Sequence, residues 1–471
     1  MKKLFGTDGM RGEAGRFPLD AQTIRTTGRS LGRHLAEQAE GGRAPLILIG
    51  RDTRESGDWI ESAFTEGAGE AGAVCHSAGV ITTPGVAFLT RTLPADAGIV
   101  VSASHNPYQD NGIKIFVPTG RKLDDATERL IEADIYQASQ KDESDAARAP
   151  ESRDEAQSQR VGIDDEAGQR ASALQARYLD YLAGEAAAGL RLDGLRIVVD
   201  CANGAASHLA PALFTRLGAQ VSAVNNTPDG RNINRECGSL YVERLREKVV
   251  AEQADLGVAL DGDADRALFL DARGQVVDGD ATLWVMAKNF QARGELAGAS
   301  VVATVMSNIG LELALKSCDI EMLRADVGDK YVLEELLRTG ATLGGEQSGH
   351  IIFPRVSLAG DGMMTTLFLL RAMREAGASL EQLSAGFTRY PQVLVNVRVS
   401  EKRPFQEVAE IAAAAGRVET ALAGEGRLLL RYSGTEPLAR IMIEGRRQDE
   451  IERLAEKLAT VIEGSLGAGK Q

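Results

Sequence analysis

The chain's strongest chemical signal is a run of three aspartates. Asp261, Asp263 and Asp265 recur at every second position, and Gly262 and Ala264 between them let the loop curl until the three carboxylates converge. Carboxylates held this close repel one another unless a cation lies between them. Oxygen-only ligands select a hard divalent ion, and a small set with room for a phosphate oxygen favours Mg²⁺. Against the alternative of an acidic surface turn, the pattern favours a magnesium site.

A serine and a histidine are adjacent in the run Val101-Ser-Ala-Ser-His-Asn-Pro107. The run follows the apolar stretch 97–101, so Ser104 is expected on a tight turn just beyond a strand. A parallel α/β sheet places its chemistry at the carboxyl ends of its strands. Ser104 is therefore a candidate nucleophile or phosphate carrier beside His105. Serine also favours turns by its own chemistry, so an ordinary turn serine stays an alternative.

A glycine-rich loop at 344–350 combines a carboxylate, a hydroxyl and an imidazole in Glu346, Ser348 and His350. Glu346 and Ser348 have the groups to hydrogen-bond vicinal sugar hydroxyls. A site built from such groups rejects ligands that leave its buried polar atoms unpaired. A plain glycine-rich turn is the alternative for this stretch.

Two other loops carry arginines that suit a phosphate. In the run 431–437, Arg431, Ser433 and the backbone amides of Gly434 and Thr435 form a candidate phosphate cradle, which Arg440 completes. A simple hairpin turn is the alternative. The run 5–12 offers Arg11 for a phosphate. It is too short and glycine-rich for a core strand, and a flexible terminal turn is the alternative.

The elements that must position these loops follow a repeating pattern. Segments beginning at 46, 195 and 300 each open with an apolar strand, a short polar turn and a helical pattern. Each later holds a second polar loop after a shorter strand-like run, at 102–106, 261–265 and 345–350. The pattern indicates a weak internal repeat of one α/β unit used three times, and it predicts a largely parallel sheet in each.

The rest of the chain follows other patterns. Residues 393–399 alternate like a strand, a helical stretch covers 405–422, two strands lie near Leu428 and Ile441, and a helix covers 449–462. This predicts a small β-α-β-β-α domain. Residues 137–175 are rich in polar and charged residues and poor in large apolar ones. They predict a mobile, solvated connection between domains, with a charged surface helix as the alternative for its middle.

Composition excludes several classes of protein. At roughly 150 residues per domain, 471 residues suggest three or four domains. A net charge of −14 and 5% aromatic residues argue against nucleic-acid binding. We expect no signal peptide and no membrane span. The four cysteines are far apart in the sequence and form no Cys-x-x-Cys pair, which fits a reducing cytoplasm and disfavours zinc or disulfides.

The five motifs, in this order, resemble those of the α-D-phosphohexomutase superfamily. They read Phe-Gly-Thr-Asp-Gly-x-Arg-Gly, Ser-Ala-Ser-His-Asn-Pro, Asp-Gly-Asp-x-Asp-Arg, Gly-Glu-Gln-Ser-Gly-His and Ser-Gly-Thr-Glu-Pro. The resemblance implies a heart-shaped α/β enzyme of four domains. Three related α/β units would cover 1–160, 172–270 and 271–385, and a TATA-box-binding-protein-like α+β domain would cover 388–466.

The resemblance also implies a reaction and roles for residues. Ser104 would carry a phosphoryl group, and Mg²⁺ would lie between it and Asp261, Asp263 and Asp265. Glu346 and Ser348 would hold the sugar, and the non-reacting phosphate would bind at Arg431, Ser433, Gly434, Thr435 and Arg440. Candidates for charge stabilisation and proton transfer, unranked, are Arg11, His105, Lys114, Arg266, Lys330 and His350.

The implied substrates are sugar phosphates. In the glucosamine branch of the superfamily, glucosamine 6-phosphate and glucosamine 1-phosphate interconvert through a 1,6-bisphosphate on the route to UDP-N-acetylglucosamine. Glucosamine or glucose 1,6-bisphosphate would prime the serine, and the enzyme would be a monomer or homodimer. With Gln347 between Glu346 and Ser348, the loop resembles that of the glucosamine branch. The alternative function is that of a phosphomannomutase/phosphoglucomutase of the same superfamily. A catalytically silent sensor would have lost the serine or an aspartate, and all four are present.

Overall fold

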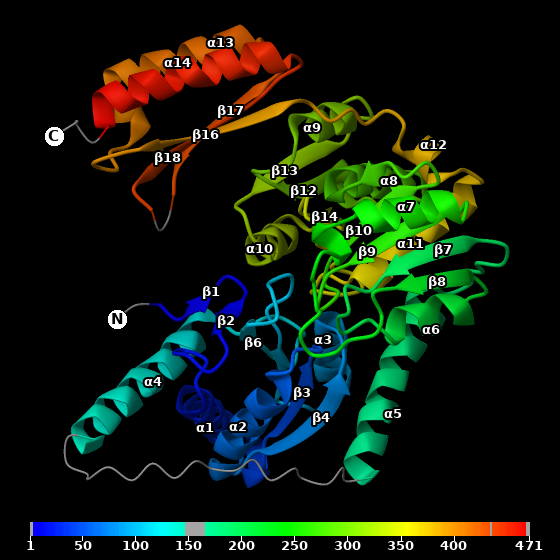
Figure 1. The fold of residues 1–471 in the computed structure, drawn as a ribbon, viewed down its shortest axis with the longest axis vertical. Coiled ribbons are helices and arrows are strands. Elements are labelled where there is room, and N and C mark those ends of the chain that lie inside the picture. The colour runs from blue at the N-terminus through cyan, green and yellow to red at the C-terminus, as the bar shows by residue number, and fades with distance from the viewer. Residues whose placement is uncertain (1–2, 147–164, 434–435, 468–471) are drawn as a thin grey trace.

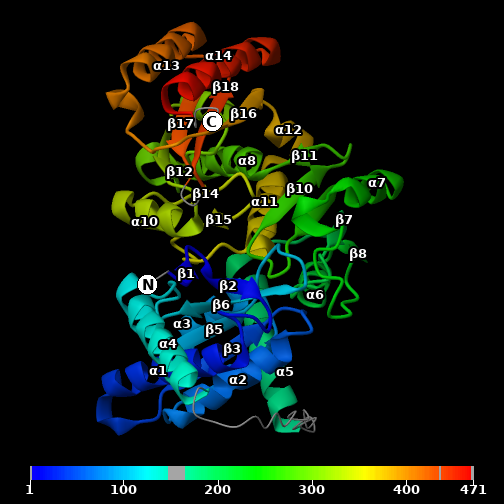
Figure 2. The ribbon, with the colours of Figure 1, turned by 60° about the vertical axis from the view of Figure 1, so that its left-hand side comes forward.

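The computed structural model describes residues 3–146, 165–433 and 436–467. Four sheet-centred units follow one another along an arc, with the first unit at one end and the fourth at the other (Figures 1 and 2). Three are larger mixed α/β units, and the fourth is a small three-stranded sheet covered by helices. This arrangement confirms the predicted four-part α/β fold.

The first unit is built on a six-stranded sheet of order β1-β2-β6-β5-β3-β4. Its strand β5 is buried along its whole length, which explains why its sequence is apolar without alternation. The strands are β1 (Phe5–Gly6), β2 (Gly9–Glu13), β3 (Leu46–Arg51), β4 (Val74–Val80), β5 (Ala97–Val101) and β6 (Asp110–Phe116). The helices are α1 (Ala21–Gln38), α2 (Gly57–Glu70), α3 (Thr83–Thr92) and α4 (Asp125–Ala146).

The second unit has a five-stranded sheet of order β11-β10-β9-β7-β8. Strand β9 is also fully buried, and it ends directly before the three aspartates. The strands are β7 (Arg196–Asp200), β8 (Gln220–Val224), β9 (Leu256–Leu260), β10 (Ala267–Asp271) and β11 (Val276–Val277). The helices are α5 (Asp165–Tyr181), α6 (Leu209–Arg216) and α7 (Glu243–Ala251).

The third unit has a four-stranded sheet of order β13-β12-β14-β15. Its helix α11 begins after Asp361, whose side chain caps the helix by accepting a hydrogen bond from the backbone N–H of Met364. The strands are β12 (Ser300–Thr304), β13 (Glu321–Ala325), β14 (Gly344–Gly345) and β15 (Ile351–Ile352). The helices are α8 (Gly279–Ala292), α9 (Ile309–Lys316), α10 (Asp329–Thr339), α11 (Gly362–Ala376) and α12 (Leu380–Ser384).

The fourth unit follows the predicted β-α-β-β-α order. Its antiparallel sheet has the order β16-β18-β17, and it has a core of its own around Ile411, Ile441 and Leu458. By contrast, one continuous buried cluster joins Val100, Val199 and Val301 of the first three sheets. The elements are β16 (Gln392–Arg398), α13 (Ala409–Leu422), β17 (Arg427–Tyr432), β18 (Leu438–Glu444) and α14 (Gln448–Leu466).

The prediction of largely parallel sheets is correct for three strands of each unit but not for the whole sheets, which are mixed. Each sheet contains three parallel strands. The chain reverses direction after the last of them, so that β6, β10 or β15 pairs antiparallel with β5, β9 or β14. The connections 102–109, 261–266 and 346–350 are far shorter than the dozen or so residues that a crossover to a parallel strand needs. The polar loops therefore lie at equivalent reversals in three units.

Two further expectations need correction. The run 5–12 is not a flexible turn, because β1 and β2 form a hairpin at the sheet edge, with β2 paired to β6 and Met10 fully buried. The connection at 137–175 is helical at both ends, in α4 and α5, because its polar sequence is compatible with exposed helix faces. Its middle lies outside the described residues. Among the described helices, none is long and apolar enough to span a membrane.

Candidate active site

The turn between β5 and β6 holds Ser104 in a fixed position. Ser104 has a left-handed backbone with φ of 51°, and its side chain is fully buried. Ser102 supports this conformation, because its hydroxyl oxygen accepts from the N–H of Ser104 at 2.9 Å and its hydroxyl donates to Asp52 at 2.6 Å. The structure thus distinguishes the two serines: Ser102 supports the turn that presents Ser104.

Sequence reasoning missed two residues that hold this turn from outside. The guanidinium of buried Arg54 donates to the carbonyl oxygens of Ser104 at 3.2 Å and Asn106 at 2.6 Å. The Asn234 amide donates to the same two carbonyls at 2.8 and 3.0 Å. Arg54 also pairs with buried Asp52, just past the end of β3. Two opposite charges directly after an apolar strand were the available signal for Asp52 and Arg54, whereas nothing local marks Asn234.

The aspartate loop between β9 and β10 lies directly against Ser104. The Ser104 hydroxyl donates to Asp261 at 2.6 Å. The three aspartates are buried, and each offers an oxygen that lies within 4.8 Å of the others. Burial, together with the charges of Asp265 and Asp263, raises the pKa of Asp261 well above its usual value. The predicted convergence of the three carboxylates is therefore present.

These carboxylates fit a bound cation. One buried oxygen of Asp263 and one of Asp265 have no hydrogen-bond partner among the described residues. Buried polar oxygens without a partner are costly, and a hard divalent ion accepts oxygen ligands of this kind. The residues present therefore suit a metal between the aspartates and Ser104.

Lys114 of β6 provides the positive charge nearest the aspartates. Its buried ammonium lies 2.8 Å from Asp263, 3.1 Å from Asp8 and 3.4 Å from Asp265. Although burial acts in the opposite direction, these three carboxylates raise the pKa of Lys114 well above its usual value. Asp8 comes from the β1–β2 turn, and it also pairs with the predicted site residue Arg11.

His105 is held as a neutral imidazole. Its Nδ1 lies 3.3 Å from the Ser104 hydroxyl and 3.2 Å from the Arg266 guanidinium. Arginine is always a donor, so Nδ1 must accept the hydrogen bond from Arg266. Burial and the positive charge of Arg266 lower the pKa of His105 to about 4. His105 and Arg266 thus lie beside the Ser104 oxygen, one neutral and one charged.

His350 lies on the other side of the aspartates and is charged. Its ring lies 3.7 Å from Asp265 and 3.9 Å from Asp329. Against the effect of burial, these carboxylates raise the pKa of His350 to about 9. The ring packs on Gly360, where any Cβ would collide with the imidazole. His350 therefore joins the second and third units at the site.

A cavity of about 460 Å³ lies beside these groups and brings together residues of three units. Glu346 lines it and accepts a hydrogen bond from the N–H of Gly328 at 3.1 Å. Lys330 instead lines an adjoining cavity, where it pairs with Asp125 at 2.6 Å. The polar and charged lining of the first cavity consists of Thr7, Asp8, Arg11, Asp265, Arg266, Asp329, Glu346 and His350.

Two residues of the 344–350 loop lie outside that lining. The buried hydroxyl of Ser348 has no hydrogen-bond partner among the described residues. The Gln347 amide is directed at Asp278, 3.4 Å away. The sequence feature that suggested a glucosamine substrate therefore does not line the cavity.

The candidate phosphate cradle of the fourth unit lies apart from Ser104. Arg431 and Arg440 are directly opposite each other on β17 and β18, and Ser433 is buried, with its hydroxyl 3.3 Å from Arg440. Like charges directly opposite are unfavourable in a sheet, so this pair is suited to an anion. Gly434 and Thr435 lie outside the described residues. Sequence reasoning missed Lys402, which donates to the Ser433 carbonyl at 2.6 Å.

Known proteins resemble this chain along its whole length. Models of the four phosphoglucomutase/phosphomannomutase domains, alpha/beta/alpha domains I, II and III and the C-terminal domain, match residues 2–142, 176–274, 278–390 and 394–461. A phosphoglucosamine mutase of Solibacter usitatus is 49% identical over 99% of both chains. One from Koribacter versatilis is 46% identical over 99% of this chain and 98% of its own.

The chain belongs to the phosphoglucosamine mutase family. It is an α/β phosphohexomutase in all four of its domains. The family relationship predicted from the five motifs is confirmed.

Solved structures share the fold. A phosphoglucomutase/phosphomannomutase family protein of Burkholderia thailandensis superposes with a TM-score of 0.76 at 23% identity, covering 100% of this chain and 98% of its own. The N-acetylphosphoglucosamine mutase of Aspergillus fumigatus, solved with GlcNAc-6P and magnesium, gives 0.62 at 19% identity over 98% and 96% of the chains.

Proposed function

We propose that this member of the family interconverts glucosamine 6-phosphate and glucosamine 1-phosphate by way of a phosphorylated Ser104. The observation that carries the proposal is the position of the Ser104 hydroxyl, 2.6 Å from Asp261 within a cluster of three buried carboxylates. The proposal is further supported by full-length relatives at 42–49% identity that are all named phosphoglucosamine mutase.

In the first half of the reaction, the bond between the Ser104 oxygen and phosphorus breaks. A new bond forms from that phosphorus to the oxygen of the free sugar hydroxyl, which gives a 1,6-bisphosphate, and the hydroxyl proton passes to the Ser104 oxygen that leaves. After the bisphosphate reorients, the bond between its other phosphorus and the sugar oxygen breaks as that phosphorus bonds to the Ser104 oxygen. The Ser104 proton passes to the freed sugar oxygen. Such transfer depends mainly on positioning and on stabilisation of charge.

Asp261, Asp263 and Asp265 would hold the metal, which we propose to be Mg²⁺. When bound, it neutralises the carboxylates and withdraws charge from a phosphate oxygen. Lys114, Arg266 and Arg11 place positive charge around the same point. Charged His350 and neutral His105 flank it, so the site has one imidazole that donates and one that accepts.

Glu346 is placed to accept hydrogen bonds from the sugar, since it lines the cavity. We also propose that Ser348, whose buried hydroxyl has no partner among the described residues, and Lys330, which lines the adjoining cavity, bind the substrate. Arg431, Ser433, Gly434, Thr435 and Arg440 would bind the phosphate that does not react. Because they belong to a separate unit, the fourth unit must approach the other three when substrate binds. Glucosamine or glucose 1,6-bisphosphate would prime the serine, and the four free cysteines fit a cytoplasmic location.

Substrate choice is tested by comparing kcat/KM for glucosamine 1-phosphate, glucose 1-phosphate and mannose 1-phosphate with the Mg²⁺-loaded enzyme. We expect glucosamine 1-phosphate to be preferred at least tenfold, or about 1.4 kcal/mol. Preference for mannose 1-phosphate would overturn the substrate in favour of a phosphomannomutase. Ser172→Ala, at an exposed serine of α5, serves as the matched control for Ser104→Ala, which must abolish turnover of every substrate.

A further inference from the structure

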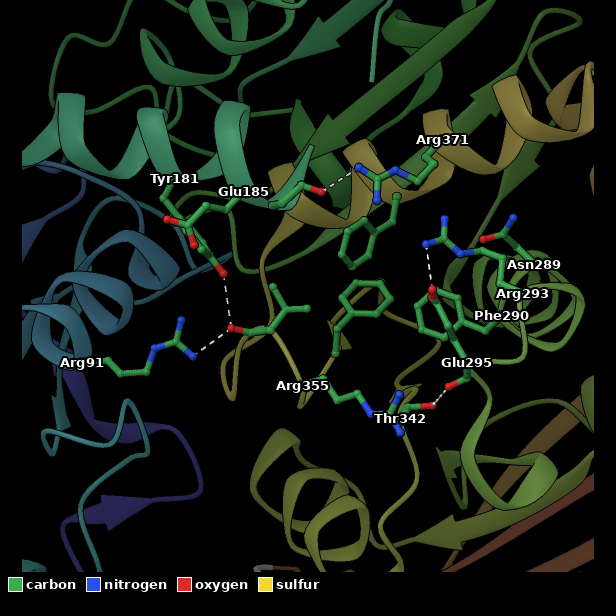
Figure 3. Close-up of a pocket in the computed structure, with 14 residues that line it drawn as sticks. Arg91, Tyr181, Glu185, Asn289, Phe290, Arg293, Glu295, Thr342, Arg355 and Arg371 are labelled. Atoms are coloured by element: carbon green, nitrogen blue, oxygen red, sulfur yellow. Dashed lines mark hydrogen bonds and ion pairs between the residues drawn. The ribbon is translucent and has the colours of Figure 1, made fainter. Parts of the chain in front are cut away.

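A second cavity, of about 510 Å³, lies where the first three units meet. It shares no residue with the cavity beside Ser104. Its side chains come from distant parts of the chain: Arg91 from α3, Tyr181 from the end of α5, Arg293 from just after α8, and Arg371 from α11. Figure 3 shows these residues and Arg355 arranged around the hollow from different sides.

The cavity has an excess of positive charge. Four arginines line it, against two carboxylates, Glu185 and Glu295. Arg293 pairs with Glu295 at 2.8 Å and with Glu375 at 2.7 Å. Among the described contacts, Arg355 makes no hydrogen bond or ion pair, and no carboxylate pairs with Arg91 or Arg371. Arginines gathered in this way are suited to a phosphate or carboxylate, which they bind through parallel N–H bonds.

Arg91 and Arg371 are already oriented. Arg91 donates to the carbonyl of Val356 at 2.8 Å, and Arg371 donates to the carbonyls of Ala186 and Ala188, both at 3.1 Å. Burial and the nearby Arg293 lower the pKa of Arg371, which reflects repulsion between the two cations. Backbone carbonyls place these guanidinium groups and leave their full positive charge in the cavity.

The interior of the same cavity is aromatic. Phe353 and Phe368 meet edge to face at 4.5 Å, and Phe290 lies 5.9 Å from Phe353. Aromatic side chains of this kind bind flat rings by stacking and edge contacts. The cavity beside Ser104 differs, because no phenylalanine, tyrosine or tryptophan of the described residues lines it. The volume of the cavity that contains the phenylalanines, about 510 Å³, is within the range of small-molecule sites.

We propose that this cavity is a second ligand site, which binds a nucleotide. The base lies against the phenylalanine rings, and the phosphate is bound by Arg355 and Arg91. The proposal depends on neither Ser104 nor the metal, and so it goes beyond the proposed function.

The site is also connected to the active site through one short segment. Phe353, Arg355 and Val356 line the cavity, and seven residues after Phe353 the chain reaches Gly360, against which the His350 ring packs. Within the segment, the N–H groups of Val356 and Ser357 both bond to the carbonyl of Phe353. A bound nucleotide therefore contacts one end of a compact segment whose other end contacts His350.

The test is calorimetric titration of the full-length protein with AMP, UMP and ribose 5-phosphate. We expect saturable one-to-one binding of at least one nucleotide, and binding of ribose 5-phosphate at least tenfold weaker because it lacks a base. Arg355→Ala should weaken nucleotide binding by about tenfold or more, the size expected for a lost charged hydrogen bond. Arg91→Ala is the second variant, in case the first is unstable. Arg447→Ala, an exposed arginine of the fourth unit, is the control.

Binding at the candidate phosphate cradle must be separated from binding here. Arg431→Ala removes an arginine of that cradle and should leave nucleotide affinity unchanged. Absence of nucleotide binding to the native chain would overturn the proposal. So would binding that survives both Arg355→Ala and Arg91→Ala but is lost in Arg431→Ala. Because binding is measured directly, a failure of this proposal is distinguishable from a failure of the proposed mutase activity.

Discussion

At the residue scale, the backbones of the aspartate loop and of the Ser104 turn approach each other closely at Gly262. A Cβ on Gly262 would collide with the carbonyl oxygen of Ser104 and press against Asn234. The Gly262→Ala enzyme should therefore lose about a hundredfold in kcat, since a displacement near 1 Å between reacting groups has that effect. Gly69→Ala is the control, because Gly69 is exposed on α2 with open space around it. Equal kcat for both variants would show that the loops need no such contact.

The residues found from the sequence and those missed differ in a physical way. The aspartates and Ser104 were predictable because the chemistry lies in their own types and spacing. Arg54 and Asn234 donate to the backbone carbonyl oxygens of Ser104 and Asn106, which are distant from them in the sequence. Because every residue type has a backbone carbonyl, the sequence gives no sign of these contacts. Their function becomes visible only when the fold brings them to the turn. Asp8 was missed for the same reason, although Arg11 nearby was named.

At the scale of elements, one lysine joins the N-terminal hairpin to the third unit. Lys122 lies 2.5 Å from Asp8, between β1 and β2, and 2.5 Å from Asp329 at the start of α10. Both elements line the cavity beside Ser104. Lys122→Met removes the ion pairs that hold Asp8 and Asp329 at the cavity. It should therefore raise KM for the sugar phosphate by roughly tenfold, while kcat changes less. Lys248→Met, which breaks an exposed pair on α7, should change neither. A fall in kcat alone would contradict this positioning role.

Strands were predicted from the sequence where they have five or six residues, and they were missed where they have only two. The repeat at 46, 195 and 300 was visible because β3, β7 and β12 are strands of five or six residues that each contain at least three consecutive apolar residues. Strands β1, β14 and β15 have two residues each, too few for any periodicity. The antiparallel reversals were nevertheless implied by the short distance from each polar loop to the next apolar run.

At the scale of the whole molecule, an ion pair within the fourth unit, Arg427 with Glu444, forms hydrogen bonds to the third unit. Glu444 is fully buried, pairs with Arg427 at 2.8 Å, and accepts from the Asn308 side chain at 3.1 Å. Arg427 also donates to the carbonyls of Val305 and Ser307. Removing one partner of a buried pair costs roughly 3–5 kcal/mol.

Arg427→Ala should therefore loosen the fourth unit while leaving its separate core folded. We expect faster proteolytic cleavage in the chain between α12 and β16, together with a larger radius of gyration in solution scattering. Arg446→Ala, which breaks an exposed pair with Glu425 in the same unit, is the control. A native cleavage rate for Arg427→Ala would show that other contacts hold the two units together.

The central claim is that Ser104 carries the phosphoryl group, and intact-mass spectrometry tests it most directly. The purified enzyme is incubated with Mg²⁺ and glucose 1,6-bisphosphate, its intact mass is measured, and it is then digested to map the modified residue. Ser104→Ala and the exposed-serine control Ser172→Ala are treated in the same way. We expect the native enzyme and Ser172→Ala to gain the mass of one phosphoryl group, mapped to Ser104, while Ser104→Ala gains none. A native enzyme that stays unmodified, or a phosphoryl group that maps to another residue, would contradict it.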